Sequence, residues 1–393
     1  MDERVYWIWM QNAFGAGSAK PMQLVRRMGS AEAFFRGGIG LWSSFSFISD
    51  KELAALSAYG AQEAEAALEY CLRLGQQVFT PDTPGYPALL REIYNPPAAL
   101  YVRGALPEIS GGIAVGVVGT RKAGAVGLRA AREISYGLAL EGAVIVSGGA
   151  LGVDSEAHRG AINGRTPTVA VLPCGLDYPY LMDNANLRRE IIDRGGALLT
   201  EYPMQTPVQR GAFQTRNRLI SGMAHGVLVA EAPEKSGALI TARYAVEQNR
   251  EVFVFIGGDD PAFAGCAALA ADGAVRVRTA EDISRALSGR RSDTRAEALR
   301  QAAEQVARPV RRVRVVSLSD CAPEEPAAAP QAEPGFSPDA QRVFGALGGT
   351  PKHASAIEAE TGLSAGAVLA ALTELELFGK IRTYPGQRFT KSV

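Results

Sequence analysis

The sequence has few cysteines and no cysteine pair. Its 393 residues include four cysteines, Cys71, Cys174, Cys266 and Cys321, and no two of them form a CxxC motif. This spacing excludes a disulfide framework and a zinc ribbon, and it favours a reducing compartment. The first ten residues lack the basic region and apolar core of a signal peptide, and no apolar run is long enough to span a bilayer. We therefore expect a cytoplasmic protein without membrane contact.

An excess of one charge is also absent. The chain has 41 Lys and Arg residues against 41 Asp and Glu residues, so its formal net charge is zero. Any polyanionic partner must therefore be bound by a local patch and not by overall attraction. Of the three histidines, His225 and His353 have no ligand-like partners nearby in the sequence. We predict no metal site and no cofactor.

The chain divides into four segments. Residues 1–65 carry helical periods and predict a small helical domain, whose GAGSAK turn resembles that of a helix-hairpin-helix or SAM-like domain. We favour packing or dimer contact for this turn over DNA contact. Residues 66–285 predict an α/β domain, and residues 286–335 a linker that is first arginine-rich and then rich in Pro and Ala. Residues 336–393 predict three helices and a hairpin, the layout of a winged helix.

The third helix of the terminal unit lacks the side chains that read base edges. Its third helical period begins at Ser364 and has no Arg, Lys, Asn or Gln before Lys380, whereas it does contain Glu374 and Glu376. We therefore favour protein contact or weak non-specific binding over sequence-specific reading of duplex DNA.

Apolar runs alternate with helical periods through the α/β segment. This alternation predicts an extended Rossmann-like, doubly wound parallel sheet, in which each strand is followed by a loop of small and polar residues. The expected strands are IAVGVV, AVIVS, PTVAVLP, ALLTEYP, GVLVAEA, EVFVFI and AVRVR. Because the loops after parallel strands meet at one edge of the sheet, a ligand crevice is expected there.

The first of these loops, VVGTRKAGAVG, does not fit the GxGxxG dinucleotide fingerprint. The glycines have a different spacing, and the acid expected about 20 residues later is not convincingly placed. A tight turn before a helix N-terminus still predicts an anion site, and Arg121 and Lys122 add positive charge there. We expect Gly119, Thr120, Arg121 and Lys122 to bind a backbone phosphate.

Further loops supply residues of the same kind. Glycines permit close approach of a ligand, and arginines can bind phosphate oxygens in pairs and stack on bases. Several anion sites along one edge favour a ligand longer than one nucleotide, such as a single strand with unstacked bases. The candidates are Ser147, Gly148, Gly149, Gly152, Arg216, Asn217, Arg218, Lys235, Ser236, Gly237 and Thr241.

An enzymatic alternative is hydrolysis of a nucleotide N-glycosidic bond in the same cleft. Asp154 and His158 are four residues apart, and Glu201, Glu231 and Glu234 lie near strand ends. We assign Asp154 to a helix cap and His158 to its helical neighbour, because such pairs are usually structural. The PGGxGTxxE signature of such hydrolases is absent. Cys174 is interpreted as a buried, inert thiol.

Six ordered motifs resemble the DNA-processing protein A (DprA/Smf) family. They are VGTRKAGAVG, SGGALGVDSEAH, LPCGLDYPY, EYP, FQTRNRLISG and EAPEKSGALITARYAVEQNREVF. The resemblance implies binding of single-stranded DNA, its protection, and loading of the RecA recombinase during natural transformation or recombination, without a chemical reaction. It also implies a homodimer formed through the Rossmann-like domain.

The chain departs from the family pattern at several basic positions. Leu151 and Thr215 stand where the family usually has arginine, and Pro167 stands where a basic residue often precedes the third strand. Arg165 lies near that third position and is included among the DNA-binding candidates. Gly257 and Gly258 replace a proline-glycine pair. The lost charges put strong DNA affinity in question but not the fold.

Overall fold

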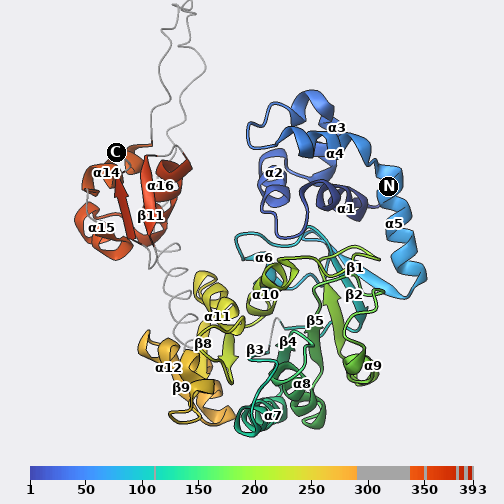
Figure 1. Cartoon of the computed structure of the whole chain (residues 1–393). Helices are drawn as coiled ribbons and strands as arrows, with labels where there is room; N and C mark the ends of the chain where they lie inside the picture. Colours follow the sequence, from blue (N-terminus) through green and yellow to red (C-terminus); the bar gives the residue numbers. More distant parts are fainter. Residues whose placement is uncertain (110–111, 290–336, 349–351, 378–379, 385–387, 392–393) are drawn as a thin grey trace, which may run out of the picture. The chain divides into compact units, whose positions relative to one another are not determined.

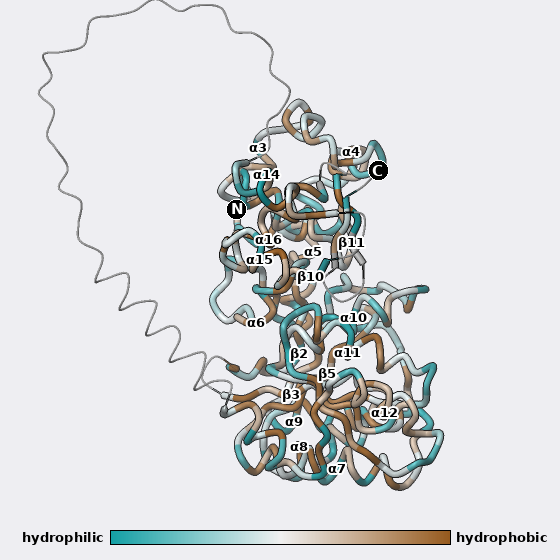
Figure 2. The backbone as a smooth tube through the Cα atoms, turned by 90° about the vertical axis from the view of Figure 1, so that its left-hand side faces the viewer, coloured by the Kyte–Doolittle hydropathy of each residue, from teal (hydrophilic) through white to brown (hydrophobic). Residues whose placement is uncertain are grey.

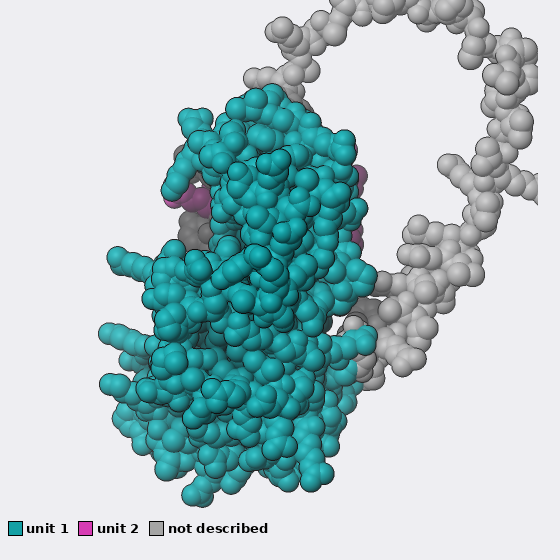
Figure 3. All heavy atoms as spheres, turned by 90° about the vertical axis from the view of Figure 1, so that its right-hand side faces the viewer, with its two compact units in different colours: residues 1–309 teal, residues 310–393 magenta. Residues whose placement is uncertain are grey.

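The computed structural model describes residues 1–109, 112–289, 337–348, 352–377, 380–384 and 388–391. The chain divides into two compact units, residues 1–309 and residues 310–393 (Figure 3). Most of the predicted linker, Cys321 and the predicted turn at Pro385 lie outside the described residues. Among the described helices, none is both long and apolar enough to cross a lipid bilayer.

Five helices form the N-terminal part of the first unit, shown in blue in Figure 1. They are α1 (Glu3–Phe14), α2 (Lys20–Met28), α3 (Ala31–Trp42), α4 (Asp50–Ala58) and α5 (Ala61–Arg73). The Asp2 side chain caps α1, and Ser49 forms a capping box with Glu52 at the start of α4. The predicted boundary at residue 65 falls inside α5, so the helical part extends to Arg73.

These helices share a hydrophobic core with one end of the sheet. Trp7 and Trp9 are fully buried in a cluster that also contains Tyr101 and Leu198 from sheet strands. The buried Gln11 amide donates to the Ala99 carbonyl at 3.0 Å and to the Glu201 carbonyl at 2.7 Å. The N-terminal part is therefore packed onto the α/β part and not only tethered to it.

A nine-stranded mixed sheet organises the first unit. Its order is β1-β2-β6-β5-β4-β3-β7-β8-β9; β1 and β2 pair antiparallel with each other, β2 pairs antiparallel with β6, and the remaining pairs are parallel. The strands are β1 (Gln76–Phe79), β2 (Leu100–Gly104), β3 (Ala114–Val118), β4 (Val144–Ser147), β5 (Thr168–Val171), β6 (Ala197–Thr200), β7 (Gly226–Val229), β8 (Glu251–Phe255) and β9 (Val275–Val277). The seven predicted strands are confirmed, and the antiparallel β1 and β2 were not predicted.

Helices cover both faces of this sheet. Alternate residues of β3 face separate cores, with Val115 and Val117 in one and Ala114 and Val118 in the other. Figure 2 shows the resulting hydrophobic colour along the central strands. The helices are α6 (Ala88–Arg91), α7 (Ala125–Leu140), α8 (Val153–Asn163), η1 (Met182–Asn184), α9 (Ala185–Asp193), α10 (Ala212–Gly222), α11 (Ala238–Glu247), η2 (Pro261–Phe263) and α12 (Ala264–Ala271).

The α/β part continues beyond its predicted end at residue 285. Leu287 is 3% exposed and packs in the same core as Ile283, Val115 and Val117. A side chain buried to this degree belongs to the folded part, because a linker residue would remain in solvent. The boundary therefore lies later than residue 285.

The described part of the second unit has the predicted helices and hairpin strands. Its elements are α14 (Pro338–Ala346), β10 (Lys352–His353), α15 (Ala354–Thr361), α16 (Ala365–Leu377), β11 (Ile381–Tyr384) and β12 (Arg388–Lys391). The three strands pair antiparallel in the order β10-β12-β11. Glu374 of α16 accepts hydrogen bonds from the Ser337 amide at 2.8 Å and hydroxyl at 2.5 Å, so it fixes the start of α14 against α16.

Candidate nucleic-acid interface

The strand order of the sheet reverses between β3 and β7. From β3 the chain proceeds through β4, β5 and β6 on one side, and it then returns to β7 on the other side. Loops that leave such neighbouring strands in opposite directions open a crevice at their carboxyl ends. A cleft of about 570 Å³ lies there, and we call it the switch-point cleft. Its polar and aromatic lining consists of Thr120, Arg121, Lys122, Asp154, Phe213, Gln214, Arg216, Asn217, Lys235, Ser236 and Thr241.

Three exposed cations surround the switch-point cleft. Arg121 and Lys122 come from the loop after β3, and Lys235 comes from the loop after β7. None of them forms an ion pair within the described part of the chain. The structure thus brings Lys235 together with Arg121 and Lys122, which precede it by 114 and 113 positions in the sequence, and it leaves their charges available to an anion.

An aromatic ring that the sequence prediction missed lies beneath Arg121. The Arg121 guanidinium carbon is 4.5 Å from the centroid of the Phe213 ring, a cation–π distance. Phe213 is half-buried and lines the same cleft. The signal was present in the motif FQTRNR, because an aromatic residue among basic residues is typical of surfaces on which bases stack.

The predicted anion site at the N-terminus of α7 is wrong at Gly124, whose amide already has a partner within the protein. The Gly124 amide donates to both carboxylate oxygens of Glu231, each at 3.0 Å, and Glu231 is 2% exposed. The Thr120 amide also donates to the Glu231 carbonyl, at 2.9 Å. An internal carboxylate therefore occupies the place where an anion was expected. Positive charge in this loop comes from the side chains of Arg121 and Lys122.

Arg216 is part of the floor of the cleft and not a surface residue. It lies in the second turn of α10, not at its start, and it is 4% exposed. Its Nη1 donates to the Gly148 carbonyl at 2.6 Å and to the Val171 carbonyl at 2.5 Å. Burial lowers its pKa, although the nearby Asp154 opposes that shift. This arginine fixes the loop after β4 to the end of β5, a role that the prediction of a phosphate-binding arginine did not include.

Arg218 does not face the cleft at all. Its side chain is 2% exposed, and Nη2 is 2.5 Å from Oε2 of Glu201, which is also buried. Oε1 of Glu201 accepts a hydrogen bond from the Gly17 amide at 3.0 Å. The predicted phosphate contact by Arg218 is therefore wrong, because its charge is used in an internal ion pair. The same contact packs the GAGSAK turn against the sheet, which is the first of the two roles that we favoured over DNA contact.

The remaining predicted residues divide between the cleft and other places. Asn217, Ser236, Gly237 and Thr241 line it together with Gly119. Ser147 ends β4, and Gly148, Gly149 and Gly152 belong to the loop after it; these four residues do not line the cleft, although Ala150 of the same loop does. A side chain at Gly152 would come within 2.5 Å of the Thr120 carbonyl. Arg165 precedes β5 and therefore lies at the amino edge of the parallel strands, away from the cleft.

Of the Asp154 and His158 pair, Asp154 is 7% exposed and lines the switch-point cleft, whereas His158 lies in the interior. His158 is fully buried, its Nδ1 is 2.9 Å from Thr168 Oγ1, and burial lowers its pKa to about 3. Burial raises the pKa of Asp154, and the Arg216 charge partly opposes this. Asp154 is the second residue of α8, whose N-cap is Gly152, so the predicted cap position is wrong by two residues. A neutral, enclosed imidazole cannot donate a proton to a ligand at neutral pH.

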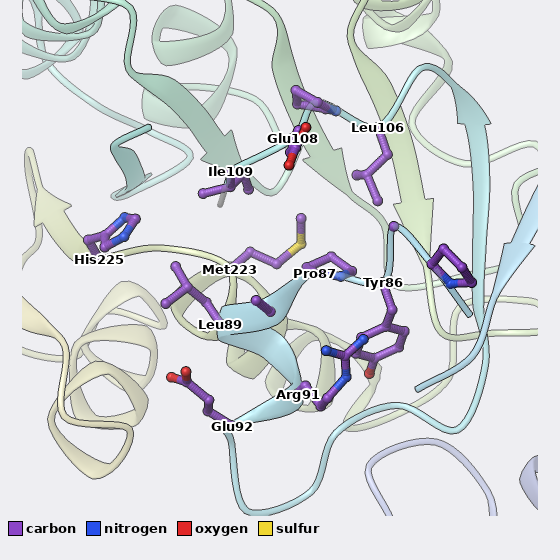
Figure 4. Close-up of a pocket in the computed structure, with 14 residues that line it drawn as sticks. Tyr86, Pro87, Leu89, Arg91, Glu92, Leu106, Glu108, Ile109, Met223 and His225 are labelled. Atoms are coloured by element: carbon purple, nitrogen blue, oxygen red, sulfur yellow. The ribbon is translucent and has the colours of Figure 1, made fainter. Parts of the chain in front are cut away.

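Neither a metal site nor the larger cavity offers a better candidate. The described residues contain no group of three or more His, Cys, Asp and Glu side chains that could hold a metal ion. A cavity of about 710 Å³ lies at the amino edge of the sheet between α6, the loop before β3 and the end of α10 (Figure 4). Its charged side chains are of both signs, and Arg91 packs on Tyr86, with the guanidinium carbon 5.5 Å from the ring centroid. It lacks the row of unpaired cations that marks the switch-point cleft.

Comparison with known proteins gives concordant matches. Residues 77–288 match the model of a family described as DNA recombination-mediator protein A, and residues 325–387 match the DprA winged helix domain. The chain is similar to protein Smf of Synechocystis, with 38% identity over 80% of each chain, and to DNA processing protein DprA of Bacillus subtilis, with 39% identity over 50% of this chain and 67% of that protein. An X-ray structure of DNA processing protein A from Streptococcus pneumoniae superposes with a TM-score of 0.53 and 31% identity, over 60% of this chain and 81% of the other.

Proposed function

Because the chain belongs to the DprA/Smf family of recombination mediators, we propose that it binds single-stranded DNA without sequence preference in the switch-point cleft. It protects the strand and loads the RecA recombinase on it during transformation or recombination, and it acts as a cytoplasmic homodimer. The bound strand is held and not chemically changed. The matched family, a recombination mediator, supports this role.

The observation that carries the proposal is the set of three exposed cations around one cleft. Arg121, Lys122 and Lys235 have no internal ion-pair partners within the described residues. A phosphate can therefore bind them without breaking an existing ion pair. Each such contact releases counterions from the nucleic acid, which makes affinity depend on salt.

Preference for a single strand follows from Phe213. Its ring lines the cleft beside the cations, and a base can stack on an aromatic ring only when it is not held in a duplex. Stacking tolerates every base, which is the expected basis for binding without sequence preference. We expect purified protein to shift a single-stranded oligonucleotide more strongly than a duplex of the same length.

Arg121→Ala tests the cleft with a single side chain. For single strands, the slope of log affinity against log salt is about −0.7 for each phosphate neutralised, so we expect the slope to become shallower by about 0.7. The measurement is fluorescence anisotropy of a labelled oligothymidylate at several salt concentrations. Arg121→Lys is the matched control, since it keeps the charge and should keep the slope. Wild-type binding that does not respond to salt would contradict the proposal.

A further inference from the structure

A second cleft, of about 270 Å³, lies beside α9, and we call it the α9 cleft. Its lining combines arginines, tyrosines and apolar side chains, and it contains no carboxylate. The polar members are Arg103, Arg188, Arg189, Tyr178 and Tyr180, and the others are Leu172, Leu176, Ala185, Ile192 and Leu198. A concave site with several cations and no acid is suited to an anionic ligand.

The arginines of the α9 cleft have hydrogen-bonding capacity that the protein does not use. Arg188 donates from Nη2 to the Tyr180 carbonyl at 2.6 Å, whereas its Nη1 is buried and has no hydrogen-bond partner. Arg103, Arg188 and Arg189 form no ion pair with any described residue. A buried cationic donor without an acceptor is costly, and an anion bound in the cleft would remove that cost.

The α9 cleft adjoins the switch-point cleft through a pair of aromatic rings. Tyr180 lines the α9 cleft, and its ring centroid is 6.2 Å from that of Phe213, which lines the switch-point cleft beneath Arg121. Burial raises the pKa of Tyr180, so its hydroxyl is neutral and does not repel an anion at neutral pH. A ligand that leaves the switch-point cleft over Phe213 therefore meets Tyr180 next.

The size and the apolar part of the lining limit the class of ligand. A volume of about 270 Å³ is near the lower end of ligand pockets, about 300 Å³, and suits one nucleotide unit better than several. An inorganic anion would make no apolar contact with Leu172, Leu176 or the tyrosine rings, whereas a base or sugar can pack against them.

We propose that the α9 cleft binds one further nucleotide of the same single strand, with its phosphate on Arg188 and Arg189 and its base or sugar against Tyr178 and Tyr180. This inference rests on the proposed function, and it extends the path of the strand beyond the switch-point cleft. The shared chemistry is that of a nucleotide phosphate, which could come from a strand or from a free mononucleotide.

The test compares oligothymidylates of about 4 to about 16 nucleotides, the range of site sizes known for single-strand binding folds. Arg189 is exposed, so Arg189→Ala should fold normally. We expect it to make the salt slope of the longer oligonucleotides shallower by about 0.7 and to leave the shortest unchanged. Arg188→Gln removes the positive charge and should therefore change the salt slope in the same way. Its amide can still donate a hydrogen bond to the Tyr180 carbonyl, which preserves the local structure. Arg194→Ala, at the end of the same helix and outside the cleft, is the matched control and should change nothing.

The outcomes separate this inference from the proposed function. Salt-dependent wild-type binding that Arg189→Ala and Arg188→Gln leave unchanged at every length would overturn the inference alone. Wild-type protein that binds no oligothymidylate at all would overturn both. Binding of thymidine monophosphate as tight as that of the longest oligonucleotide, and lost in Arg189→Ala, would assign the cleft to a free nucleotide and would also overturn the inference.

Discussion

Replacing Arg121, Lys122 and Lys235 together by alanine is expected to reduce the affinity for single-stranded DNA about a hundredfold at 0.1 M salt. Each phosphate contact contributes about 0.7 to the slope of log affinity against log salt, so three lost contacts make this slope shallower by about 2. Between about 1 M and 0.1 M salt, a tenfold change, this difference in slope corresponds to about 2 log units of affinity. The three side chains are exposed and unpaired in the described structure, so their removal should leave stability within about 0.5 kcal/mol of the wild type. Anisotropy titrations at several salt concentrations measure both quantities.

The control for this variant removes the same charge elsewhere in the first unit. Arg73, Arg194 and Arg276 are exposed and lie outside the switch-point cleft. Their replacement by alanine changes the net charge equally, so any effect of overall attraction would appear in both variants. Equal losses in the two triple variants would mean that the cleft is not the binding site.

The sequence predicted the parallel part of the fold well because its signal is local. The predicted strands at the centre of the sheet are short apolar runs, and runs of this kind are buried between two layers of helices, whereas β9 at the edge has two exposed residues. The strands β1 and β2 were missed because QQVF and LYVRG are short and partly polar, and their pairing is with distant segments. Arg121, Lys122 and Lys235 could be placed at one edge because parallel strands fix the direction of their loops.

The errors concern arginines and amides whose partners are far away in the sequence. Arg218 is paired with Glu201, on a different element, and the Gly124 amide is paired with Glu231, 107 residues away. The RNR motif has the same letters whether its arginines face solvent or the sheet. Only the tertiary structure decides this, because burial of a charge depends on whether a partner is within reach.

The buried Arg218–Glu201 pair gives the second large effect, this time on stability. Glu201→Ala alone is expected to lower the free energy of unfolding by about 3 to 5 kcal/mol, because it leaves the Arg218 charge buried without a partner and also removes the acceptor of the Gly17 amide. The double variant Glu201→Leu with Arg218→Met should lose less than Glu201→Ala, since no uncompensated charge remains. Urea denaturation of the full chain, followed by tryptophan fluorescence, reports on this region because Trp7, Trp9 and Trp42 all lie in the core that the N-terminal helices share with the sheet.

The same double variant distinguishes an internal arginine from a DNA-binding one. If Arg218 acts only through Glu201, the folded double variant should bind single-stranded DNA with the wild-type salt slope, whereas a phosphate contact would make the slope shallower by about 0.7. A shallower slope together with wild-type stability would show that the ion pair opens and that Arg218 reaches the strand. An unchanged slope would leave Arg121, Lys122 and Lys235 as the electrostatic basis of the cleft, with Arg218 joining the N-terminal helices to the sheet on which that cleft is built.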